Sequence, residues 1–307
     1  MKTQTRLHSG LATLTACLAL IGCGSGSSGN SSATLPTATP PTTTTTPTDP
    51  STSAASRTTG LWKGSVASST TGQTSVVVAL TGHDGHSVWM TADGRVWDGQ
   101  VPTSGDHFSS TFVGHMHDGA RFPDGTNHGP TSMMVDHHSS STSSGRYTGS
   151  GDGGTFSISL SPMWSRPASL GTLAGVYTRS TSSGYTMTMS ISADGQLAGS
   201  DSRGCVFGGT VRVPNVNHNM YDIDAHVTSC GSLDGHYQGM GTLLDADAMQ
   251  DWMAEMHPLE HGGRSLGGPI RGGSNMMGRN TVPTGLHNLF MFSMVNTNNA
   301  IMDALGR

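Results

Sequence analysis

The sequence predicts a mainly β fold of two related antiparallel β-barrel or β-sandwich units, with a short helical insertion in the second. One observation is that apolar and polar residues alternate strictly over 156–160, 185–191 and 221–227. A period of two is typical of half-buried antiparallel strands. Another is that Asp-Gly turn signals, such as Asp93-Gly94 and Asp194-Gly195, separate these runs. Many short strands at this spacing are typical of small barrels and sandwiches.

The chain begins with the features of a secretory signal peptide, residues 1–22. Lys2 and Arg6 precede an apolar run over residues 11–21, which is the layout of an export leader. The run is too short for a membrane-spanning helix, which needs about 20 residues. Cys23 follows directly and resembles the lipobox cysteine of bacterial lipoproteins. This resemblance implies that Cys23 is acylated, becomes the new N-terminus and anchors the protein to a membrane through lipid.

Residues 23–58 have the composition of a tether. Gly and Ser dominate residues 24–33, and Thr and Pro dominate residues 34–52, without apolar periodicity. Such a segment buries too little apolar surface to offset the entropy lost on ordering. We therefore expect a disordered spacer between the lipid and the folded part.

The charge balance argues against nucleic acid as a partner. Removing residues 1–22 takes away two of 15 basic residues and none of the 20 acidic ones, so the net charge moves from −5 to −7. Lys63 is the one lysine that remains. Phosphate binding needs clustered cations, so we expect no nucleic acid to bind.

Two cysteines remain after export and acylation, Cys205 and Cys230. An even pair in an oxidising compartment favours a disulfide, and the alternative is two buried free thiols. A bridge would close a loop of about 25 residues and stabilise the protein by roughly 3 kcal/mol in the chain-entropy model.

A weak internal repeat divides the folded part into units at 59–165 and 166–307. Each unit opens with Gly-x-Trp or Gly-x-Tyr, contains an Ala-Asp-Gly turn and carries Gly-x-Tyr-x-Gly-x-Gly, at 145–151 and 235–241. Two copies of one β-unit account for this order.

An insertion at 244–286 interrupts the second unit. Asp245 is a candidate cap for a helix whose apolar positions, from Met249 to Met256, follow the helical period. We also expect a second short helix over 298–305.

The folded part of the chain resembles a group of proteobacterial outer-membrane lipoproteins. The resemblance covers roughly residues 60–300 and is most specific over 165–243. The motifs that carry it are Leu173-Ala-Gly175-Val-Tyr177, Ala193-Asp194-Gly195, Gly204-Cys205, Asn219-Met-Tyr221, Cys230 and Asp234-Gly235-His-Tyr237-Gln-Gly239. It implies an outer-membrane location and the pairing of Cys205 with Cys230. It implies no activity.

Histidines are concentrated in the first unit and suggest a metal site. Eight lie between His83 and His138, and imidazole is a ligand for copper, zinc and nickel. The residues selected as candidate ligands are His83, His86, His107, His115 and His117. The alternative is that histidine and methionine simply fill polar and core positions, with no cofactor.

These observations lead us to expect a lipid-anchored, non-catalytic binding or structural module of the cell envelope. Its partners would be the membrane, through the lipid, and an unknown protein or small ligand. A metal-binding protein that uses the histidines of residues 83–138 is one alternative. A hydrolase with its site near 244–286 is another.

Overall fold

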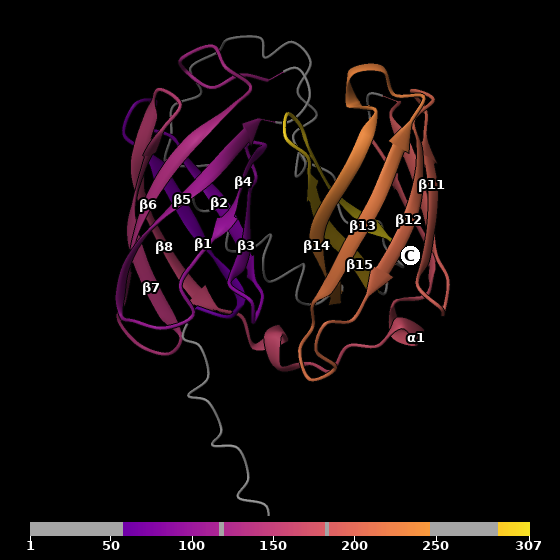
Figure 1. The fold of residues 1–307 in the computed structure, drawn as a ribbon, viewed down its shortest axis with the longest axis horizontal. Helices are drawn as coiled ribbons and strands as arrows, with labels where there is room; N and C mark the ends of the chain where they lie inside the picture. Colours follow the sequence, from indigo (N-terminus) through magenta and orange to yellow (C-terminus); the bar gives the residue numbers. More distant parts are fainter. Residues whose placement is uncertain (1–57, 117–119, 182–183, 246–287) are drawn as a thin grey trace, which may run out of the picture. The chain divides into compact units, whose positions relative to one another are not determined.

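The structure is a computed structural model that describes residues 58–116, 120–181, 184–245 and 288–307. These residues form 16 strands arranged as two closed antiparallel barrels, and both barrels belong to one compact unit, Pro50–Arg307. Figure 1 follows them from indigo through magenta and orange to yellow. The predicted mainly β fold with two antiparallel units is therefore confirmed, and each unit is a barrel.

The first barrel contains β1 (Gly60–Ser68), β2 (Thr74–Thr81), β3 (His86–Thr91), β4 (Arg95–Gln100), β5 (His107–Met116), β6 (His128–His137), β7 (Thr142–Gly149) and β8 (Asp152–Leu160). Each strand pairs with the next in sequence, and β8 closes the barrel on β1. Trp62 on β1, for example, lies opposite Ala79 on β2 and Leu160 on β8.

The second barrel contains β9 (Gly175–Ser180), β10 (Thr186–Ile191), β11 (Gln196–Asp201), β12 (Val206–Arg212), β13 (Tyr221–Thr228), β14 (Gly235–Asp245), β15 (Asn288–Val295) and β16 (Ala300–Gly306). It closes where Gly306 of β16 pairs with Thr178 of β9. Along the chain, the 3₁₀ turn η1 (Pro162–Ser165) and the helix α1 (Leu170–Leu173) connect the first barrel to the second. A further 3₁₀ turn, η2 (Gly231–Leu233), precedes β14. In the described part of the chain, no helix has the length and apolar character needed to cross a membrane.

The alternation seen in the sequence places every second residue inside a barrel. The first interior holds a buried cluster that includes Trp62, Trp89, Trp97 and Phe156. The rings of Trp89 and Phe156, for example, pack edge to face, with their centroids 5.0 Å apart and their planes at 74°. Such pairs are worth roughly 0.5–1.5 kcal/mol beyond the area that they bury.

The second interior is also filled by large side chains. Its cluster includes Tyr177, Phe207, Tyr237, Phe290 and Phe292. Closed eight-stranded barrels are just wide enough for side chains to fill, and both interiors fit that description.

A third cluster explains why some strands are apolar on both faces. It gathers the residues of β1–β4 that alternate with the interior ones, such as Val78 and Leu80, with those of β14–β16, such as Met240 and Met291. Met163 and Trp164 of η1 join them. These strands therefore lose the polar positions that mark a half-buried strand in a sequence.

The predicted helix over 298–305 is wrong, because this segment is strand β16. Its residues pair with β15 over the full length, from Val295 opposite Ala300 to Leu289 opposite Gly306. Leu305 faces the interior cluster, and Met302 belongs to the third cluster. Because both faces of β16 are buried, its sequence lacks the alternation of apolar and polar residues that marks a half-buried strand. A short apolar run of this kind cannot be distinguished from a helix by periodicity.

The predicted insertion begins slightly later than expected. Leu244 and Asp245 still belong to β14 and pair with Leu289 and Asn288, and Asp245 forms an ion pair with Arg166. The helix predicted between Met249 and Met256 lies outside the described residues.

The internal repeat is offset by one strand between the two barrels. The Ala-Asp-Gly turn follows the third strand of the first barrel but the second strand of the second barrel. The Gly-x-Tyr-x-Gly motif likewise lies on the seventh strand, β7, in one barrel and on the sixth, β14, in the other. The Ala-Asp-Gly turn and the Gly-x-Tyr-x-Gly motif are therefore both one strand earlier in the second barrel. The opening motifs at Gly60 and Gly175, in contrast, both lie on the first strand of their barrel.

Candidate functional site

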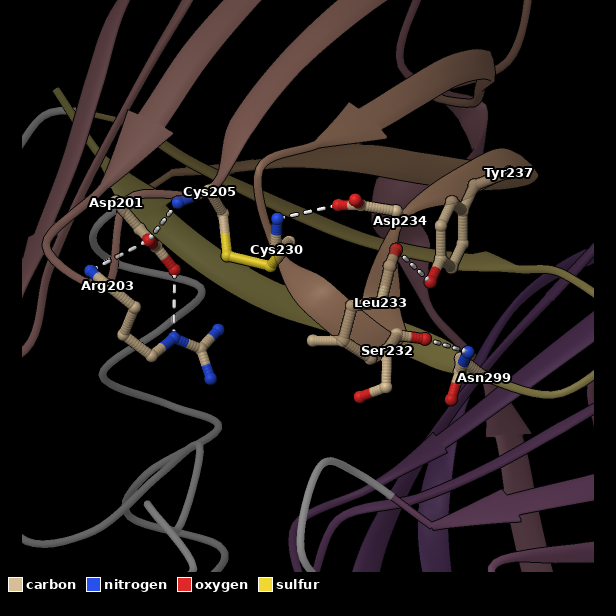
Figure 2. The surroundings of a disulfide bond; sticks show 9 residues. All are labelled: Asp201, Arg203, Cys205, Cys230, Ser232, Leu233, Asp234, Tyr237 and Asn299. Atoms are coloured by element: carbon tan, nitrogen blue, oxygen red, sulfur yellow. Dashed lines mark hydrogen bonds and ion pairs between the residues drawn. A yellow bond between two sulfur atoms is a disulfide. The ribbon is translucent and has the colours of Figure 1, made fainter.

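The disulfide between Cys205 and Cys230 is present, as predicted. Figure 2 shows it beside the short segments that precede β12 and follow β13. The carboxylate of Asp201 accepts hydrogen bonds from the backbone N–H of Cys205, at 3.0 Å, and of Arg203, at 2.9 Å. Asp234 accepts from the backbone N–H of Cys230 at 2.6 Å. These bonds fix both cysteine backbones at one end of the barrel.

The rest of this region also has well-defined partners. Tyr237 donates its hydroxyl proton to the carbonyl of Leu233 at 2.8 Å, and Asn299 donates to the carbonyl of Ser232 at 3.1 Å (Figure 2). The disulfide therefore belongs to a hydrogen-bonded structural cap.

The histidines predicted as metal ligands lie at separate places in the first barrel. His83 lies in the turn before β3 and accepts a hydrogen bond from Asn215 at 2.9 Å. Burial and the nearby His218 lower its pKa. His86 starts β3, with its Nε2 2.7 Å from Oδ2 of Asp98. That hydrogen bond raises the pKa of His86.

His107 and His115 both lie on β5 but in different surroundings. His107 is exposed, and its Nδ1 lies 2.7 Å from the carboxylate of Asp136 on β6. His115 is only 2% exposed, and its buried Nδ1 has no hydrogen-bond partner. Its ring lies 6.2 Å from that of His128, the residue directly opposite on β6.

The structure does not gather these candidates into one site. Among the described residues, His83, His86, His107 and His115 belong to no group of three donors close enough to hold a shared ion. His117 lies outside the described residues, as do Cys23 and most of the insertion. Several methionines belong instead to the buried clusters, for example Met133, Met187 and Met291.

The structure instead brings together three donors on the second barrel: Asp224, His226 and His236. Their ligand atoms all lie within 4.8 Å of one another. Asp224 and His226 are two residues apart on β13, so they point to the same face of the sheet. That face is the outer one, because the alternating residues Ile223 and Ala225 belong to the interior cluster. His236 lies directly opposite His226 on β14.

Close contacts connect the three side chains. The rings of His226 and His236 are stacked, with centroids 4.6 Å apart. Nε2 of His236 lies 2.8 Å from Oδ1 of Asp224, and Gln238 donates to the other carboxylate oxygen at 3.4 Å. The hydrogen bond to His236 lowers the pKa of Asp224, so this carboxylate is charged at neutral pH.

Sequence reasoning recognised the strand over 221–227 but treated 235–241 only as a repeated motif, and it missed this group. The alternation over 221–227 already placed Asp224 and His226 on one face. The position of His236 opposite His226 depends on the register between β13 and β14, which the sequence does not state. The available signal was a pair of neighbouring strands that each carry histidine on the polar face.

The fold and these sites define a class: a two-barrel antiparallel β protein with one structural disulfide and an exposed imidazole–carboxylate group. Comparisons with known protein families, with curated proteins and with solved structures find no match to this chain.

Proposed function

We propose that this chain is a lipid-anchored protein of the cell envelope that acts by binding at the outer surfaces of its barrels, without catalysis. The observation that carries this proposal is that both barrel interiors are filled by packed side chains. Trp97 and Tyr147 lie with ring centroids 5.2 Å apart in the first barrel, and Tyr177 and Phe290 lie 5.7 Å apart in the second. A ligand would therefore meet the outside of the protein.

The anchor part of the proposal rests on Cys23 and the residues around it. An apolar leader that ends at a cysteine supports acylation, and the Thr- and Pro-rich residues 34–52 support an extended spacer. Several acyl chains together hold a protein on a bilayer persistently, whereas one alone binds only marginally. The resemblance to outer-membrane lipoproteins, and Gly24 after the cysteine, favour the outer membrane.

A buried serine–histidine pair argues for packing rather than hydrolysis. Nδ1 of His137 lies 2.5 Å from the hydroxyl of Ser143, which is the contact that an activated nucleophile requires. Ser143 is 1% exposed and His137 is 8% exposed, with the rings of Trp62 and Phe108 beside the imidazole. A substrate carbonyl has no access to this hydroxyl.

Metabolic labelling with radioactive palmitate tests the anchor. Full-length protein should carry the label and sediment with membranes, and Cys23→Ser should lose the label and move to the soluble fraction. Cys17→Ser is the matched control, because it changes a cysteine within the leader and should keep both properties. Label on the Cys23→Ser protein would overturn the anchor.

Titration with the fluorophore 1-anilinonaphthalene-8-sulfonate tests the filled interiors. The native full-length protein, held in a non-ionic detergent, should show no saturable binding beyond the detergent blank, and binding should appear only on unfolding. Saturable binding by the natively folded protein would show a ligand-accessible interior and contradict the proposal.

A further inference from the structure

We propose that Asp224, His226 and His236 form a binding site for a divalent first-row transition metal ion on the outer face of the second barrel. This site is separate from the five histidines that the sequence suggested. It goes beyond the proposed function, because metal binding requires neither the lipid anchor nor an envelope partner.

The backbone already does most of the positioning. His226 and His236 are direct cross-strand neighbours, and such neighbours have Cβ atoms about 4.5–5.5 Å apart. Asp224 lies two residues before His226, and the pair Asp224–Gln238 is the next one on the same face. The three donors therefore come from two rigid strands in the middle of a sheet, and no loop has to fold around the ion.

The donor atoms are close to the spacing that a metal requires. They lie within 4.8 Å of one another, and one pair is already at 2.8 Å. Metal–nitrogen and metal–oxygen bonds to such an ion are about 2.0–2.2 Å, which places neighbouring ligand atoms roughly 3 Å apart. Side-chain rotations of exposed groups cover that difference, since His226 is exposed and Asp224 is only half-buried.

The charges also favour a cation. Asp224 offers a carboxylate to the ion, and its present partner is the ring N–H of His236. For Nε2 of His236 to bind an entering ion, the neutral ring carries its single proton on Nδ1 instead, so the imidazole and the carboxylate can both bind the ion. Gln238 holds the other carboxylate oxygen at 3.4 Å and limits its rotation.

The ligand set selects the class of ion. Two imidazoles and one carboxylate suit zinc, copper, nickel or ferrous iron, whereas calcium and magnesium prefer oxygen ligands alone. Three protein ligands on an open sheet face leave at least one coordination position for water or for an exogenous ligand. The site is therefore of the open kind, on a surface that a second molecule can reach.

Equilibrium dialysis of the full-length protein against Zn²⁺ and Co²⁺, followed by elemental analysis, tests the proposal. The protein is purified in detergent with a histidine-free tag and stripped of metal beforehand. We expect one bound ion that disappears in His226→Ala and in His236→Ala. Asp224→Asn should weaken binding by more than the roughly 10–100-fold typical of losing a group that only orients a ligand.

A matched control separates a three-ligand site from an exposed histidine–carboxylate pair. His107 and Asp136 form such a pair at 2.7 Å on the first barrel, so His107→Ala should leave the bound ion and its affinity unchanged. Circular dichroism verifies that each variant folds. The proposal would be overturned if His107→Ala lost as much bound metal as His226→Ala. It would also be overturned if His226→Ala and His236→Ala both bound metal fully, since the three residues would then form only a surface hydrogen-bond cluster. Binding that persists in the unacylated Cys23→Ser protein would support the site even if the anchor proposal failed.

Discussion

Arg95 and Asp152 form a buried ion pair inside the first barrel, with Nη1 of Arg95 2.6 Å from Oδ2 of Asp152. The side chains are 8% and 4% exposed. Tyr147 donates its hydroxyl proton to the same carboxylate at 2.9 Å, and Ser68 donates to the other oxygen at 2.7 Å. The second barrel also contains an ion pair, between Arg179 and Asp303, whose side chains are 11% and 6% exposed.

We predict that Asp152→Ala destabilises the protein by about 3–5 kcal/mol, because it removes one partner of a buried charge pair. Burial acts to raise the pKa of Asp152, but hydrogen bonds from Ser68 and Tyr147 and the charge of Arg95 outweigh it, so that pKa is lowered. The measurement is the free energy of unfolding in urea at pH 7.

Asp136→Ala serves as the comparison, because Asp136 pairs with His107 on the exposed face. Exposed pairs are worth about 0–1 kcal/mol, so this variant should remain close to the original stability. Similar losses in the two variants would show that burial does not determine the cost at Asp152.

Removal of the disulfide should destabilise the second barrel by about 3 kcal/mol. The bond joins residues 25 apart in sequence, and a loop of that length restricts the unfolded chain by roughly this amount. The Cys205→Ser, Cys230→Ser double variant should show it in a urea titration under non-reducing conditions. Adding a reductant should lower the stability of the original protein but leave the double variant unchanged, and an equal response of both would contradict the prediction.

Two adjacent glycines on β12 should respond differently to alanine. A Cβ on Gly209 would lie 2.1 Å from the carbonyl oxygen of Asp224, whereas a Cβ on Gly208 meets no atom within 4 Å. Overpacking of this kind costs roughly 1–3 kcal/mol, so Gly209→Ala should lower the thermal midpoint clearly. Gly208→Ala should change stability by less than about 0.5 kcal/mol. A calorimetric scan that finds equal midpoints for both would contradict the close approach of β12 and β13.

The buried His115 should make stability fall as the pH drops from 6.5 toward 4. Burial lowers the pKa of His115 to about 4, His128 adds to the effect, and the charge of Asp98 opposes it. Because the folded pKa is below the unfolded value, the unfolded chain binds more protons in this window, and stability falls as the pH falls. The shift corresponds to about 3 kcal/mol.

Urea titrations at pH 7, 5.5 and 4 measure this contribution. His115→Leu should flatten the decline by about that amount, because it removes the titrating group. His107→Ala, which changes an exposed histidine on the same strand, should keep the original slope. An unchanged slope in His115→Leu would assign the decline to other groups.

The residues that alternate could be read directly, and those strands were predicted correctly. Tyr185 to Ile191 contains β10, and Tyr221 to Val227 lies within β13, because each strand has one face in a barrel interior and one face toward water. The pairing of Cys205 with Cys230 followed from the small number of cysteines. Both are properties of short stretches or of composition.

Strands buried on both faces were the ones that sequence reasoning missed. β16 carries Met302 in one cluster and Leu305 in another, so its residues show no alternation, and the segment was expected to be a helix. The strand is stabilised by pairing with β15 and by apolar contacts on both sides, neither of which is encoded within seven residues.

By itself the sequence determined the fold class, the two-unit organisation and the disulfide, because these depend on local periodicity, repeated turn signals and cysteine count. Only the tertiary structure decided which histidines meet. His83, His86, His107 and His115 are close in sequence, yet each faces its own partner. Asp224, His226 and His236 converge because the hydrogen-bond register of β13 and β14 sets His226 opposite His236, and a shift by one residue would turn that histidine to the other face.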